Sequence, residues 1–207
     1  LNALPGDERA KTIIGGPVFM FDSNYDITDE PFMYNGAQYV LTKDINIPNV
    51  TFELDAGKNI QGWSQGNECV KYPINTTYNT DGRRQTNNIP IFRYADILLT
   101  KAECILRGAT ATNGATAAAL VNEVRDCCGA PHCSSITLDE LLDERGREFF
   151  AELWRRNDLI RFGQYEKERP YVKEINPEHW NDKRMRLFPI PKGTMNTNVN
   201  WAQNPGY

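Results

Sequence analysis

The hydrophobic pattern of this chain changes at Pro90, and this change constrains the fold more than any other feature. After it, apolar residues recur at helical spacing in two adjacent stripes. One stripe contains Tyr94, Ile97, Leu98 and Ile105, and the other contains Ala95, Leu99, Ala102 and Leu106. A helix that is apolar over most of its circumference is expected to be buried between neighbouring elements. Gly108 is a suitable C-terminal stop for it.

Two further helices are predicted after this one. The second begins near Thr116 and ends at Gly129, so that it forms a helical hairpin with the first. The third begins with Thr137 and Glu140, which have the spacing of a capping box. Its apolar side is marked as far as Ile160, and we expect it to run without a break to Gly163.

Residues 1–89 have a different composition, rich in Asn, Thr, Gly, Asp and Pro. Short alternating runs at 39–42 and 50–54 fit strands separated by turns. The sequence therefore predicts a mainly α protein with long irregular loops and a few short strands. Its loop-rich segment covers 1–89 and its helical region covers 90–207, within one continuous domain.

Charge and composition exclude several classes of protein. The chain has 23 lysine and arginine residues against 27 aspartate and glutamate residues, a formal net charge of -4. The basic residues are interspersed with acids, which disfavours nucleic-acid binding. The sequence contains neither a signal peptide nor a membrane-spanning apolar run. Its loop-like start is typical of a mature or cut fragment, so we expect the N-terminal part of the protein to be missing.

Three of the five cysteines lie close together around His132. The spacing of Cys127, Cys128, His132 and Cys133 matches no common zinc pattern, so no metal site is predicted. In an oxidising compartment, Cys128 or Cys127 could form a small disulfide loop with Cys133. Reduced, half-buried thiols are the alternative.

Carboxylates and guanidiniums alternate along residues 144–161 at spacings of three and four. A pair of catalytic acids is one interpretation, but each acid has an arginine within one turn, which favours structural ion pairs. The predicted set is Arg93, Asp96, Glu144, Arg147, Asp158 and Arg161. Neither histidine, His132 or His179, lies in a nucleophile motif, and Gly15-Gly16-Pro17 lacks the features of a phosphate loop. We therefore predict no catalytic residue and no cofactor.

Ligand recognition is the remaining function, and aromatic residues among amides and glycines are suited to it. Trp63 lies in such a loop, and similar composition surrounds Tyr78, Arg83 and Trp180. These four residues are the predicted ligand contacts.

Four motifs occur in the order of one known family. They are 93–99, 121–125, 144–163, and the C-terminal 187–191 with 203–207. On these motifs the chain resembles the C-terminal part of the SusD/RagB family of glycan-binding outer-membrane lipoproteins, over about residues 90–207. The resemblance implies a tetratricopeptide-like helical scaffold of the α-α superhelix type. It also implies capture of oligosaccharide or polysaccharide, a lipid anchor outside this chain, and a SusC-like TonB-dependent transporter as partner.

Other functions stay open at this point. The chain could belong to a glycoside hydrolase acting on the same substrates, to a peptide-binding nutrient protein, or to a docking scaffold. Neither the identity of the glycan nor a bound calcium ion can be derived from these residues.

Overall fold

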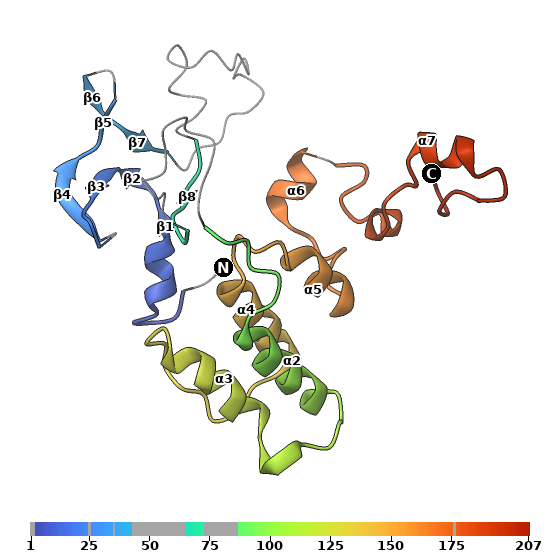
Figure 1. Cartoon of the computed structure of the whole chain (residues 1–207), viewed down its shortest axis with the longest axis horizontal. Coiled ribbons are helices and arrows are strands. Elements are labelled where there is room, and N and C mark those ends of the chain that lie inside the picture. The colour runs from blue at the N-terminus through green and yellow to red at the C-terminus, as the bar shows by residue number, and fades with distance from the viewer. Residues whose placement is uncertain (1–2, 25, 35, 43–64, 73–86, 176) are drawn as a thin grey trace. The chain divides into compact units, whose positions relative to one another are not determined.

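The computed structural model describes residues 3–24, 26–34, 36–42, 65–72, 87–175 and 177–207 (Figure 1). The chain divides into two compact units. The first, here called the ribbon unit, comprises the N-terminal region up to Leu98 together with Asn122–Ser134. The second, here called the helical unit, comprises Leu99–Val121 and Ser135–Tyr207.

The ribbon unit begins with a short 3-10 helix, η1 (Glu8–Thr12), and continues as two-stranded antiparallel ribbons. The pairs are β1 (Ile13–Ile14) with β8 (Glu68–Cys69), β2 (Gly16–Pro17) with β7 (Val40–Leu41), β3 (Phe19–Phe21) with β4 (Ile27–Pro31), and β5 (Met33–Tyr34) with β6 (Ala37–Gln38). The predicted strand at 39–42 contains β7, whereas the one at 50–54 lies outside the described residues.

Local side chains shape these ribbons. In the turn between β3 and β4, the Asp22 carboxylate accepts hydrogen bonds from the backbone N–H groups of Asn24 and Asp26, at 2.8 and 2.9 Å. Gly36 has a φ of 81°, a value that glycine adopts without steric cost, between β5 and β6. A two-stranded ribbon is only marginally stable alone, so these ribbons depend on packing beyond their own hydrogen bonds.

The helices occupy most of the chain after residue 93. They are α2 (Tyr94–Leu106), η3 (Thr112–Gly114), α3 (Ala117–Asp126), α4 (Leu138–Glu148), α5 (Arg155–Arg161), α6 (Pro170–Ile175), η4 (Lys183–Arg186) and α7 (Lys192–Thr197). Within the helical unit the buried apolar residues include Leu99, Ala102, Leu120, Val121, Leu141, Leu142, Phe149 and Leu159. The predicted mainly α composition agrees with the described residues. None of the helices in this described part is both long and apolar enough to cross a membrane.

Two predicted helix boundaries are confirmed by their hydrogen bonds. Beyond α2, Gly108 adopts a φ of 98°, and the Ala109 N–H donates to the Cys104 carbonyl at 2.9 Å, as in a Schellman motif. Before α4, the Glu140 N–H donates to the Thr137 hydroxyl at 3.3 Å, and the Thr137 N–H donates to the Glu140 carboxylate at 2.8 Å. This reciprocal pair is the capping box read from the sequence.

The prediction of one helix from Thr137 to Gly163 is wrong. The chain leaves the helical conformation after Glu148, where Ala151 and Leu153 have φ values of 63° and 65°. A straight helix would separate residues 145 and 158 by about 20 Å. The break instead lets α5 fold back, so that Arg145 hydrogen bonds directly to Asp158.

The expectation that α2 is buried around most of its circumference is also wrong. Leu98, Leu99 and Ala102 are buried, but Tyr94 is 69% exposed and Ile97 is 58% exposed. The apolar residues of α2 therefore divide into a buried stripe and an exposed one.

Candidate functional site

Of the four predicted ligand contacts, the structure describes one. Trp63, Tyr78 and Arg83 lie outside the described residues. Trp180 lies in the turn between α6 and η4 and is partly exposed. Its geometry is therefore the part of the predicted site that can be built from the structure.

The turn that carries Trp180 is held by short-range polar contacts. The Lys173 ammonium, from α6, lies 5.5 Å from the centroid of the indole ring, within the range of a cation–π interaction. Asp182 caps η4 by accepting the Arg184 N–H at 2.8 Å, and it also pairs with the Arg184 guanidinium at 3.1 Å. These contacts position an aromatic ring and a cation side by side at a partly exposed turn.

The chain beyond this turn is clamped by arginines. Arg186 donates to both carboxylate oxygens of Glu166, at 2.5 and 2.6 Å, and this hydrogen-bonded pair holds the pKa of Glu166 below its usual value. The Arg156 guanidinium donates to the carbonyls of Met185 and Arg186 and lies 4.3 Å from the centroid of the Phe188 ring.

The C-terminus returns to this clamped segment. Gln203 makes two hydrogen bonds with the backbone of Ile190, and the Tyr207 hydroxyl donates to the Leu187 carbonyl at 3.0 Å. The proline-rich motif and the terminal motif thus form one extended, hydrogen-bonded piece.

A chain of alternating charges runs through the helical unit. Arg145 donates to one carboxylate oxygen of Asp158 at 2.9 Å, and Arg161 donates to the other at 2.9 Å. Arg161 also makes two hydrogen bonds to Glu103, at 3.0 and 2.8 Å, and Arg107 makes one to Glu103 at 2.9 Å. This ion-pair network links α2, α4 and α5.

Aromatic rings complete the network. The Arg145 guanidinium lies 4.9 Å from the centroid of the Phe149 ring and 5.9 Å from that of Trp154. Arg107 and Arg161 lie 5.0 and 5.4 Å from the centroid of Phe162. The planar guanidiniums therefore contribute apolar packing as well as hydrogen bonds.

The structure places the other predicted ion-pair residues as follows. Glu144 accepts from Arg147 at 2.8 Å, and its side chain is 0% exposed. Asp96 is buried, and its backbone N–H donates to the Arg93 carbonyl at 2.9 Å. Sequence reasoning did not include Glu103 in the set, because its partner Arg161 lies 58 residues away and no local spacing reveals such a contact.

The acids of this network are poorly placed for glycoside hydrolysis. That reaction needs two carboxyl groups that face a bound sugar. The Asp158 side chain is only 1% exposed and both of its oxygens are engaged by arginine, while Glu144 is completely enclosed. These carboxylates act as structural acceptors and are not accessible to a sugar.

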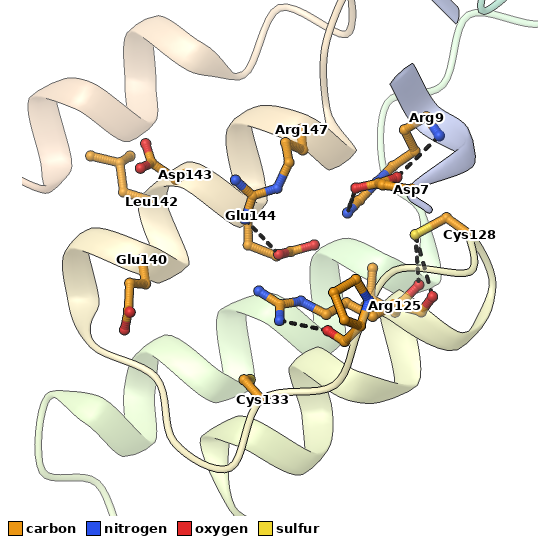
Figure 2. A network of polar contacts seen from close by, with 12 residues as sticks. Asp7, Arg9, Arg125, Cys128, Cys133, Glu140, Leu142, Asp143, Glu144 and Arg147 are labelled. Atoms are coloured by element: carbon orange, nitrogen blue, oxygen red, sulfur yellow. Dashed lines mark hydrogen bonds and ion pairs between the residues drawn. The ribbon is translucent and has the colours of Figure 1, made fainter. Parts of the chain in front are cut away.

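The cysteine cluster lies at the end of α3 in the ribbon unit (Figure 2). The predicted Cys128–Cys133 disulfide is not formed in the structure. Cys128 is buried with its sulfur 3.4 Å from the Arg125 carbonyl, while Cys133 exchanges backbone hydrogen bonds with the Asn122 side chain, both at 2.9 Å. Among the residues that the structure describes, no group of His, Cys, Asp and Glu side chains could hold a metal ion.

Cys128 belongs to a different set of contacts. The Glu8 N–H donates to the Cys128 carbonyl at 2.9 Å, and the Cys128 thiol is within hydrogen-bonding reach of the Asp7 carboxylate. Figure 2 shows Asp7 paired with Arg9, whose two N–H groups reach it at 2.9 and 2.7 Å. Burial acts to raise the pKa of Asp7, but the contacts with Arg9 and Cys128 outweigh it and leave this pKa lowered. The cysteine thus helps to anchor the N-terminal 3-10 helix.

Comparison of the sequence with known protein families shows the class to which this chain belongs. The model of the SusD family matches residues 32–207, which is most of the chain. The chain belongs to the SusD family, and its resemblance to that family is confirmed over a longer stretch than the motifs alone indicated.

One curated relative is the starch-binding protein SusD of Bacteroides thetaiotaomicron. It is 33% identical over 159 residues, which cover 72% of this chain and 27% of the relative. The chain thus spans about a quarter of the length of that protein. The relative's name describes binding and not catalysis, in agreement with the prediction of a carbohydrate-binding protein that is not an enzyme.

Proposed function

We propose that this chain is part of a cell-surface protein that binds oligosaccharides or polysaccharides without cleaving them. The observation that carries the proposal is the family match over residues 32–207, together with the 33% identity to a protein named for starch binding. Enclosure of Asp158 and Glu144 in ion pairs supports binding over hydrolysis.

We also propose its place in the cell, on the basis of the resemblance. The protein is an outer-membrane lipoprotein whose anchor lies outside this chain, and it delivers captured glycan to a SusC-like TonB-dependent transporter. In this proposal, further residues of the same protein complete the structure. The shared length supports this, because the chain spans only 27% of its relative.

The helices serve as the scaffold of this protein. In this proposal they form part of a tetratricopeptide-like superhelix that begins near residue 90, while residues 1–89 supply loops that carry function. The long-range ion pairs between α2, α4 and α5 support the role of a rigid support.

The ligand is contacted by Trp63, Tyr78, Arg83 and Trp180. An aromatic face packs against the C–H groups of a sugar, and cationic or amide groups bind its hydroxyls. The pairing of Trp180 with Lys173 supports this assignment, since it joins a ring and a hydrogen-bond donor at a partly exposed turn.

A glycan array followed by a reducing-end assay tests the proposal. The 207-residue chain is applied to an array of neutral glycans that includes starch fragments, and each bound glycan is then incubated with the chain and assayed for new reducing ends. We expect saturable binding with no reducing ends formed. Absence of binding to every glycan, or release of reducing ends that scales with protein concentration, would contradict the proposal.

A further inference from the structure

We infer that an aromatic cluster in the ribbon unit, formed by Phe32, Tyr34 and Tyr39, is a contact surface for a neutral glycan. The inference rests on the proposed function and assigns to it a site that the sequence did not indicate. Its residues differ from the four ligand contacts predicted from the sequence.

The three rings are arranged around Tyr39. The centroids of Phe32 and Tyr39 are 6.0 Å apart with the ring planes at 90°, and those of Tyr34 and Tyr39 are 6.5 Å apart at 64°. Edge-to-face pairs of this kind are favourable and hold each ring in a defined orientation. The cluster is therefore ordered before any ligand arrives, which reduces the entropy lost on binding.

Backbone hydrogen bonds hold the same residues in place. The Tyr39 N–H donates to the Phe32 carbonyl, the Phe32 N–H donates to the Val18 carbonyl, and the Val18 N–H donates to the Tyr39 carbonyl, each at 2.9 Å. Tyr34 is part of β5 and pairs with Ala37 of β6. Three chain segments thus converge beneath the rings.

The rings are not part of a closed core. Phe32 is 38% exposed, and Tyr34 and Tyr39 are partly exposed. In the ribbon unit the fully buried apolar positions include Leu41 and Leu98 instead. An ordered aromatic cluster that stays accessible has the form that sugar stacking requires.

Two of the three rings, Tyr34 and Tyr39, carry a phenol hydroxyl. Burial of the Tyr39 ring raises the pKa of its phenol, and the nearby charge of Glu68 and the Tyr34 side chain raise it further. Tyr39 therefore stays protonated at neutral pH. A phenol group beside an aromatic face can exchange hydrogen bonds with the hydroxyls of a neutral sugar.

The test compares neighbouring residues at the start of β5. Met33 is the first residue of β5, is 54% exposed and takes part in neither of the two ring contacts with Tyr39. The variants are Phe32→Leu, which keeps apolar volume but removes the ring, Tyr34→Leu, and Met33→Leu as the matched control. Each is applied to the same glycan array, with maltoheptaose among the probes, and its melting temperature is recorded.

We expect Phe32→Leu and Tyr34→Leu each to weaken glycan binding about tenfold, which corresponds to the loss of one good stacking contact. Met33→Leu should bind like the wild type. If the wild type binds a glycan and all three variants bind it equally well, the aromatic site is wrong while the proposed function stands. If the wild type binds none of the glycans, both fail.

A measurement on the unmodified protein covers the case of variants that do not fold. Maltoheptaose, or whichever array glycan the wild type binds, is titrated into the wild-type chain while the ring protons of Phe32 and Tyr34 are followed by NMR. Shifts of these protons, with intermolecular contacts to sugar C–H groups, are the expected result. Saturation of the protein without any change at these rings would overturn the inference.

Discussion

The helices around Asp158 and the ribbons around Tyr39 differ in which side chains they bury and which they expose. In the helical unit, charged groups such as Arg145, Asp158 and Glu103 are buried and paired. In the ribbon unit, large apolar residues are exposed along the strands and their connections, namely Met20, Phe21, Ile27, Phe32, Met33 and Val40. Buried ion pairs hold the helices in one arrangement. Exposed aromatic rings, in contrast, can contact a ligand. In the proposals above, the first region is a support and the second is a contact surface.

The largest effect is expected from breaking the buried network. Arg145→Met removes the donor to Asp158 and leaves a carboxylate that is 1% exposed with less compensation. Removal of one member of a buried pair typically costs about 3–5 kcal/mol. We expect a loss of this order in the free energy of unfolding, measured by urea denaturation.

The matched control is Asp143→Asn. Asp143 forms a longer ion pair with Arg155 at 3.7 Å, and both side chains are well exposed. Exposed pairs contribute little, so this variant should stay within about 0.5 kcal/mol of the wild type. If both variants lost the same free energy of unfolding, the buried ion pairs would contribute no more to stability than the exposed one.

A smaller loss is expected from the start of α4. Thr137→Ala removes the hydroxyl that accepts the Glu140 N–H, at a typical cost of about 1 kcal/mol. Thr137→Ser keeps the hydroxyl and should lose much less. Urea denaturation of both variants checks this, and a loss in Thr137→Ser as large as in Thr137→Ala would exclude the cap as the cause.

The ribbon unit has its own charged anchor, which predicts a pH dependence. Because the pKa of Asp7 is lowered in the folded state, its contribution is present above the unfolded value near 3.8 and is lost as the pH falls through the folded value. Asp7→Asn should therefore make stability less dependent on pH in the acid range below about pH 4.

Melting temperatures between pH 2.5 and 7 measure this effect. Arg9→Met provides the companion variant, because it removes the donor of both side-chain hydrogen bonds to Asp7. It should remove the same acid-dependent contribution. If the melting temperatures of both variants fell at acid pH as much as that of the wild type, the assigned role of the pair would be contradicted.

The smallest effect on stability is expected at Trp180. The ring is partly exposed and its side-chain contact is with Lys173, so Trp180→Ala should lower the melting temperature only slightly. Glycan binding, however, should weaken measurably under the proposed function. Calorimetry beside a melting curve separates the two quantities, and Lys173→Met serves as the control for the cation. A large stability loss with unaltered binding would make Trp180 a structural residue.

Local signals predicted the boundaries of the helices well. The Thr137 and Glu140 capping box and the stop at Gly108 depend on residues within one turn, so their spacing contains the necessary information. The break after Glu148 carries no such signal. Ala151 and Leu153 do not favour positive φ, and only the contacts that α5 gains by folding back can hold them there.

The candidate site shows the same limit. Aromatic residues among amides led to the prediction of Trp180, which stays untested. The proposed cluster around Tyr39 has no such signal, because its rings approach one another from both sides of a tight hairpin. The possible Cys128–Cys133 disulfide stays a prediction, and both thiols are free in the structure. Close spacing in sequence suggested a bridge from Cys128 to Cys133, while the fold directs their side chains to different partners.

Short-range chemistry in these 207 residues specified the helical region, its caps, the ordered motifs and hence the SusD family. Those features depend on interactions between residues that are close in the sequence. Their spacing can therefore be recognised from the sequence itself. Tertiary contact decided where α4 ends, that Arg161 pairs with Glu103 across 58 residues, and which acids are enclosed. Such pairings depend on how the chain folds back on itself, and burial then converts them from surface charges into a connected network.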